Sequence, residues 1–165
     1  MPRERTDRVI LEHALREQKP VLAICYGCQL LNVYLEGTLV QDVRQETGTT
    51  VAHRRKDVTP EAKDDPKHEV RFADGSRLAE MNGGPHGVVN SSHHQSVLKP
   101  GRELEITGRA SDGIVEGVEW TRDKNWVVGV QWHPERMKGD ALAGKLFTEL
   151  VAAVEAHRKA TAKIQ

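Results

Sequence analysis

Apolar and polar positions alternate along this chain in patterns that predict short strands between helices. An apolar stripe among Arg and Glu predicts an amphipathic helix over residues 4–17, and a similar stripe predicts a last helix over about residues 140–157. Apolar runs bounded by turn residues predict strands at 21–24, 68–72, 88–90, 103–110, 115–120 and 127–132, with turns at 111–113 and 122–125. A second helix follows the first strand and ends at Gly37, and a short third one starts after Ser76. Helix, strand and helix in this order predict an α/β fold with one right-handed step of a doubly wound sheet.

Residues 45–67 show no periodicity. Charges of both signs alternate there, which favours a solvated loop over a basic binding patch. Loops of this length are uncommon unless they are functional or mobile, so we predict a mobile loop, which in a hydrolase can serve as a lid.

The stretch from Lys19 to Gln29 holds the first candidate chemistry. Its strand ends at Cys25 and a helical pattern follows, and a cysteine on such a turn is the thiol form of the nucleophile elbow. The small residues Ala23 and Gly27 suit a sharp turn, and the start of a helix favours thiolate over thiol. A buried core cysteine, or a redox pair of Cys25 with Cys28, explains this stretch equally well when it is taken alone.

His133 follows the apolar run at 127–132, and Glu135 lies two residues further on. A cysteine nucleophile needs a base nearby, and that base needs a third group to fix its tautomer. The two residues therefore have the chemistry to complete a triad with Cys25.

Four segments together resemble a known superfamily. The segments Ile24-Cys-Tyr-Gly-Cys-Gln29 and Gly129-Val-Gln-Trp-His-Pro-Glu135 resemble, in this order, the elbow and the His-x-Glu motif of class I glutamine amidotransferases. Val89-Asn-Ser-Ser-His-His-Gln95 and residues 30–42 resemble one branch, the gamma-glutamyl-gamma-aminobutyrate hydrolases. The resemblance implies a class I glutamine amidotransferase-like, flavodoxin-like sheet with helices on both faces, in a single domain over residues 1–165.

The resemblance also implies a role for each residue. Cys25 would attack the amide carbonyl of a small gamma-glutamyl substrate, His133 would protonate the leaving amine and then activate water, and Glu135 would orient His133. The backbone N–H of Tyr26 would serve the oxyanion hole. Gln29 and His93 would bind substrate. No metal and no organic cofactor is implied, and we interpret Cys28 as a packing residue.

Zinc is the competing interpretation of the histidines. His93 and His94 could join Cys25 and Cys28 around an ion, but structural zinc sites combine a pair such as C-x-x-C with a pair such as H-x-x-x-H, and these two histidines are adjacent. Adjacent histidines on a strand also point in opposite directions. We therefore expect no metal site.

Part of the family pattern is not found before Cys25. In the family, several strands precede the helix at 4–17, and a Gly-Gly loop among them gives the oxyanion hole a second N–H. No Gly-Gly-x-Asp segment precedes Cys25 in the 165 residues. We expect a sheet without the family's first strands, an open edge that self-associates or binds a partner, and little hydrolysis by this chain alone. The alternative is an inactive or partner-dependent module.

Composition excludes several other classes. Lys plus Arg equals Asp plus Glu at 24 each, so no net charge draws the chain to nucleic acid or to a membrane surface. Aromatic residues make up 4%, which argues against a base-stacking surface. The two cysteines do not form a disulfide framework, and a thiol site suits a reducing compartment. With no secretory or membrane-spanning pattern, we expect a soluble cytoplasmic protein.

Overall fold

A computed structural model describes residues 2–121 and 125–162, so most of the predicted turn at 122–125 lies outside the described residues. The elements are α1 (Pro2–Arg16), β1 (Val21–Ile24), α2 (Tyr26–Tyr34), β2 (Thr38–Val40), α3 (Val43–Thr47), α4 (Arg55–Val58), β3 (Lys67–Phe72), α5 (Arg77–Asn82), β4 (His86–Asn90), β5 (Ser96–Lys99), β6 (Leu104–Ala110), β7 (Val115–Trp120), β8 (Val127–Val130), the 3-10 turn η1 (Pro134–Arg136) and α6 (Ala141–Ala162). The predicted helices and strands all appear, with shifted ends.

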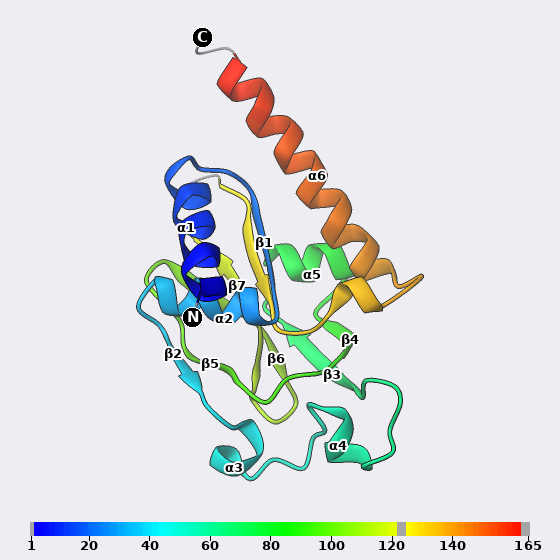
Figure 1. Cartoon of the computed structure of the whole chain (residues 1–165). Coiled ribbons are helices and arrows are strands. Elements are labelled where there is room, and N and C mark those ends of the chain that lie inside the picture. Colours follow the sequence, from blue (N-terminus) through cyan, green and yellow to red (C-terminus); the bar gives the residue numbers. More distant parts are fainter. Residues whose placement is uncertain (1, 122–124, 163–165) are drawn as a thin grey trace.

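A six-stranded sheet in the order β1-β8-β7-β6-β3-β4 forms the centre of the molecule (Figure 1). β1 and β8 run parallel, with Ile24 opposite Val130, and every other pair in this sheet is antiparallel. All four residues of β8 are buried, which is the pattern of a strand covered on both faces. The two strands whose ends carry the candidate chemistry are therefore direct neighbours.

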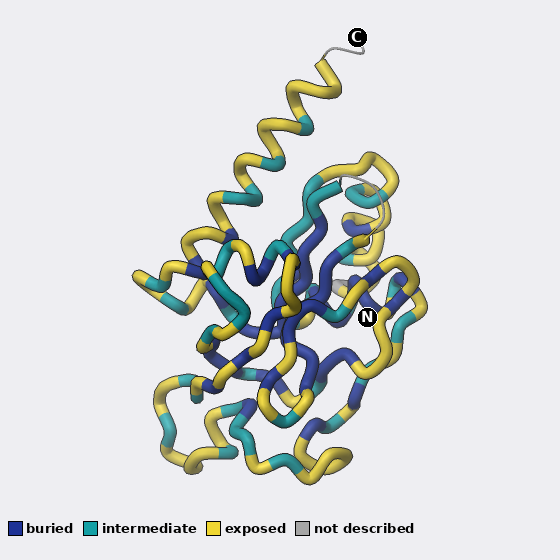
Figure 2. The backbone as a smooth tube through the Cα atoms, turned by 180° about the vertical axis from the view of Figure 1, so that it is seen from behind, coloured by how far each residue is buried: buried dark blue, intermediate teal, exposed yellow. Residues whose placement is uncertain are grey.

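Helices cover both faces of the sheet, as predicted. Leu11 of α1 and Leu31 of α2 pack with Val127 in one core, whereas Leu146 of α6 packs with Val128 in the other. Consecutive β8 residues thus face opposite cores, as the alternation of side chains along a strand requires. The C-terminal half of α6 extends beyond the sheet and is mostly exposed (Figure 2). Among the described residues, no helix is both long enough and apolar enough to span a membrane.

A second, two-stranded sheet pairs β2 with β5 and was not predicted. The amide of Asn32 attaches it to α2, donating to the carbonyls of Thr38 and Lys99, each at 3.1 Å. The position of the Asn32 amide explains why residue 37 is a glycine, because a Cβ there would lie 2.4 Å from that amide. The residue with a left-handed backbone at this helix end is Glu36, at φ 70°. The glycine is needed for close approach rather than for a left-handed conformation.

The segment 45–67 is more structured than its sequence pattern indicates. It contains the end of α3, whose first turn is capped by Asp42 accepting from the Gln45 N–H at 3.0 Å, and all of α4. It also carries His53, which is only 1% exposed. Mobility of this segment stays a prediction, but one of its residues belongs to the interior.

One edge of the large sheet is open, because β1 has β8 as its single neighbour among the described strands. A hollow beside it is lined mainly by apolar side chains, including Ile10, Leu11, Val21, Leu150 and Val154. Ile10 is 62% exposed and Val154 is 39% exposed. The predicted open edge next to the elbow strand is thus present in the described part of the chain.

Candidate active site

Cys25 lies between β1 and α2 in a strained left-handed conformation, with φ 49° and ψ −104°. Its N–H donates to the Val130 carbonyl at 2.8 Å, and its own carbonyl accepts from the Gln29 N–H at 3.1 Å, so strand and helix both hold it. A non-glycine residue is kept in such a conformation only when its surroundings enforce it, and such strain is common at active sites. A Cβ on Gly27 would lie 3.7 Å from that of Ala23, so the turn has room for a methyl group and little more.

The Cys25 thiol is half-buried. Burial raises the pKa of Cys25, although the backbone N–H of Tyr26 opposes the shift. The direction is opposite to the sequence-based expectation, in which the helix start alone favoured thiolate. Nε2 of Gln131 lies 3.5 Å from the sulfur and donates to it. A base is therefore needed to activate this thiol.

Cys28 is a core residue. It is 1% exposed, and burial raises the pKa of its thiol far above the usual range. It packs against Gly129 of β8, where an added Cβ would lie 3.0 Å from the Cys28 sulfur. Both cysteines are free. These facts favour the packing interpretation over a resolving thiol.

His133 and Glu135 form the pair that a triad requires. Nδ1 of His133 lies 2.6 Å from Oε1 of Glu135. A carboxylate can only accept, so Nδ1 carries the proton and Nε2 is left with the lone pair of a base. The Cys25 N–H donates to the carbonyl of Val130, the last residue of β8, and His133 follows Val130 by three residues. The His133–Glu135 pair and the thiol therefore lie at the same end of the two parallel strands.

Asn90 at the end of β4 holds the backbone of His133 on both sides. Its Oδ1 accepts from the His133 N–H at 3.0 Å, and its Nδ2 donates to the His133 carbonyl at 3.1 Å. Asn90 is 4% exposed, so water does not compete freely for these bonds. Sequence reasoning missed this role, although Asn90 lies in the 89–95 segment that carried the resemblance.

Three glutamines link the interior to the thiol. Nε2 of Gln29 donates to the Gln95 carbonyl and to Oε1 of Gln131, both at 3.1 Å, and Gln131 in turn donates to Cys25. Gln29 is 8% exposed. Its predicted role in substrate binding stays a prediction, as does the oxyanion role of Tyr26, the first residue of α2.

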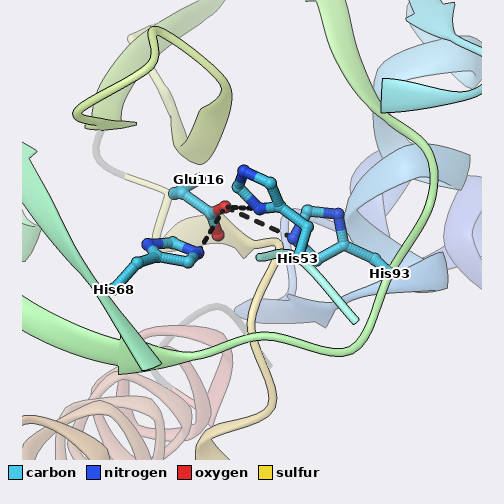
Figure 3. A group of neighbouring side chains, drawn as sticks. All are labelled: His53, His68, His93 and Glu116. Carbon is cyan, nitrogen blue, oxygen red and sulfur yellow. Dashed lines mark ion pairs between the residues drawn. The ribbon is translucent and has the colours of Figure 1, made fainter. Parts of the chain in front are cut away.

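His93 belongs to a second cluster, together with His53, His68 and Glu116 (Figure 3). It is 5% exposed, whereas its neighbour His94 is exposed, in keeping with the opposite directions expected for adjacent histidines. Its ring faces the buried carboxylate of Glu116, together with those of His53 and His68. A substrate-binding role for His93 stays a prediction.

Sequence reasoning missed this cluster, because three of its members stood in unrelated contexts. His53 fell in the predicted loop, His68 at a strand start, and Glu116 in an apolar strand. A glutamate inside the run Val115–Trp120, where buried neighbours flank it, was the one available signal.

The fold is that of class I glutamine amidotransferases. The structure superposes with a TM-score of 0.61 on a crystal structure of a glutamine amidotransferase from Thermotoga maritima, at 15% identity, covering 96% of this chain and 63% of that one. The predicted fold class is thereby confirmed.

Sequence comparison then identifies the family: residues 1–135 match the Peptidase C26 profile, and the chain belongs to that family. It is 31% identical to the gamma-glutamyl-gamma-aminobutyrate hydrolase PuuD of Escherichia coli, over 94% of this chain and 61% of PuuD. It is 34% identical to the protein NtpR of Enterococcus hirae, over 82% of this chain and 55% of NtpR. The chain thus spans between about half and two thirds of these relatives.

Proposed function

We propose that this chain carries the catalytic cysteine of a hydrolase that cleaves gamma-glutamyl amide bonds through a thioester. The observation that carries the proposal is the strained turn at Cys25, which lies beside the end of β8. From β8 the chain continues through Gln131, whose amide donates to the Cys25 sulfur, to His133. The similarity to PuuD, which is named a gamma-glutamyl-gamma-aminobutyrate hydrolase, supports the gamma-glutamyl class of substrate.

In the proposed reaction, Nε2 of His133 accepts the Cys25 proton while the sulfur attacks the amide carbonyl. The backbone N–H of Tyr26 stabilises the oxyanion that forms. His133 then gives its proton to the leaving amine, and a glutamyl thioester remains on Cys25. Finally His133 takes a proton from water, the resulting hydroxide attacks the thioester, glutamate leaves, and the sulfur regains its proton. Glu135 keeps the imidazole in the required tautomer throughout.

A partner-dependent or inactive module is the second candidate, and the open edge of β1 favours it. The 165 residues contain no Gly-Gly-x-Asp segment before Cys25, and loss of one oxyanion donor costs about 10²–10³ in rate. We therefore expect slow steady turnover by this chain, and a stoichiometric reaction is the better test.

Labelling with a diazoketone analogue of glutamine separates the two candidates. This reagent needs gamma-glutamyl recognition, whereas iodoacetamide needs only an accessible thiol. We expect the analogue to label Cys25 in the natural chain and in Cys28→Ser, and to label nothing in Cys25→Ser. If iodoacetamide alkylates Cys25 but the analogue does not, the thiol lacks a gamma-glutamyl site and the inactive-module interpretation replaces the proposal.

A further inference from the structure

Four buried side chains from four parts of the fold converge on one point (Figure 3). His53 comes from the segment before α4, His68 from β3, His93 from the segment after β4, and Glu116 from β7. None is more than 8% exposed. Oε1 of Glu116 lies 3.5 Å from Nδ1 of His53 and 3.3 Å from Nε2 of both His68 and His93.

The outer nitrogen of each ring already has an oxygen partner. The pairs are His53 Nε2 with Asp112 Oδ2 at 3.0 Å, His93 Nδ1 with the Gln95 carbonyl at 2.9 Å, and His68 Nδ1 with the Glu69 carbonyl at 3.3 Å. Carboxylate and carbonyl oxygens only accept, so each outer nitrogen carries the ring proton. The inner nitrogens of three neutral imidazoles then direct their lone pairs at a carboxylate. Metal-binding histidines are oriented by oxygen partners in this way.

Most polar atoms at the centre of this cluster have no partner in the described part of the chain; Nδ1 of His53 differs, because it lies 3.3 Å from the Ser91 hydroxyl. Nε2 of His68, Nε2 of His93 and both oxygens of Glu116 are buried without a hydrogen-bond partner there. Glu119, on the same strand, shows the usual alternative, because its oxygens accept from the backbone N–H groups of Arg77 and Leu78 at 3.0 and 3.1 Å. Converging lone pairs without a donor are costly in the interior, and a cation removes that cost.

We propose that His53, His68, His93 and Glu116 form a structural Zn²⁺ site. Tetrahedral zinc with bonds of about 2.0–2.1 Å places neighbouring ligand atoms about 3.3–3.4 Å apart. The nitrogen-to-oxygen distances of 3.3, 3.3 and 3.5 Å match this spacing, and all four ligand atoms lie within 4.8 Å of one another, so the imidazole nitrogens would draw together around the ion. Three imidazoles and a carboxylate complete four-coordination and leave no position for water, which is typical of a structural rather than a catalytic site. The charges of Glu116 and Asp112 together balance the ion.

The site would hold the active-site wall in place. His93 donates its Nδ1 proton to the Gln95 carbonyl, which also accepts from Gln29, and Gln29 leads through Gln131 to the thiol of Cys25. The ion would also anchor the 45–67 segment through His53. Sequence patterns did not predict this metal, since its ligands are far apart in the chain and not in short pairs.

Metal analysis tests the proposal directly. The chain is purified without a metal-affinity tag, stripped with a chelator, exposed to Zn²⁺ and passed through a desalting column. We expect one zinc per chain by mass spectrometry of the metal, a higher melting temperature with Zn²⁺ than with chelator, and no such rise with Mg²⁺. Co²⁺ in place of zinc should give the intense visible absorption of a tetrahedral site.

Three variants assign the binding to these residues. His68→Gln should abolish stoichiometric zinc, whereas His94→Gln, which changes an exposed histidine, should keep it. Asp112→Asn should weaken zinc affinity by about 10–100-fold, as loss of a histidine's oxygen partner does elsewhere. Zinc at well below one per natural chain, the pale spectrum of octahedral Co²⁺, or natural affinity in His68→Gln would each overturn the proposal. If His68→Gln does not fold, the Co²⁺ spectrum of the natural chain and the affinity of Asp112→Asn decide.

Discussion

Replacing Asn90 tests whether the backbone of His133 must be held for the chemistry to occur. Asn90→Ala removes one acceptor and one donor, at 3.0 and 3.1 Å, and leaves the N–H and the carbonyl of His133 without these partners. An unsatisfied buried polar group costs about 1–3 kcal/mol, which gives about 2–6 kcal/mol for two groups. Because the His133 side chain is 13% exposed and water can reach part of the gap, we expect the lower end, about 2–3 kcal/mol.

The same change should slow the chemistry of Cys25 more than stability alone explains. A displacement of about 1 Å in a catalytic group can cost about 10²-fold in rate, so labelling by the glutamine analogue should slow by about that factor. Asn82→Ala is the matched control, because the Asn82 side chain likewise makes two hydrogen bonds to the backbone, donating from Nδ2 to the carbonyls of Gly84 and His86, each at 2.8 Å. It should lower stability and leave labelling unchanged.

Urea unfolding gives the stabilities, and timed labelling at a temperature where all variants are folded gives the rates. A destabilised Asn90→Ala that still labels at the natural rate would show that this contact does not position His133. An Asn90→Ala of unchanged stability would refute the two hydrogen bonds themselves.

The packing and charge of the described residues lead to three more predictions. Iodoacetamide should alkylate Cys25 well before the buried Cys28. Because the pKa of Cys25 is raised, its thiolate fraction and labelling rate should still rise with pH above about 8.5, the ordinary thiol value. A labelling rate that levels off below that pH would contradict the shift. Gly129→Ala should lower the free energy of unfolding by about 1–3 kcal/mol, because the added Cβ would lie 2.7 Å from Cγ2 of Val118. Gly144→Ala, in open space on α6, should raise it by about 0.5–1 kcal/mol in urea unfolding. Equal effects of the two substitutions would refute this packing. We expect the open edge of β1 to bind a second copy of this chain. Light scattering should therefore show self-association, and Ile10→Glu should reduce it. A monomer at all concentrations would contradict this expectation.

Sequence patterns were sufficient for the parts of the site that have a strong local signal. β1 and β8 are unbroken apolar runs, and each is followed closely by a residue with unusual chemistry, so Cys25 and His133 could be placed at strand ends from the sequence alone. The amphipathic stripes likewise predicted the helices α1 and α6, whereas their placement on opposite faces of the sheet was implied by the family resemblance.

Other features depend on contacts between distant segments and left little local trace. β2 (Thr-Leu-Val) and β5 (Ser-Val-Leu-Lys) are as short as β1 and β8 but are not unbroken apolar runs, so neither gives a strand signal. His53 is buried because the charged segment around it folds over Glu116 and Ser91, and no neighbouring residue signals this. The raised pKa of Cys25 likewise reflects burial by the whole fold, whereas the local helix start indicated the opposite shift.

The central claim is that Cys25 accepts a gamma-glutamyl group with His133 as its base. Acid-quenched mass spectrometry after mixing the chain with a gamma-glutamyl anilide tests this most directly, since a single acylation event leaves a detectable mass even when turnover is slow. We predict a glutamyl adduct on the peptide that contains Cys25, located to that residue by fragmentation, and none in Cys25→Ser or His133→Ala. An adduct on Cys28, an adduct that persists in His133→Ala, or no adduct on the natural chain would contradict the claim.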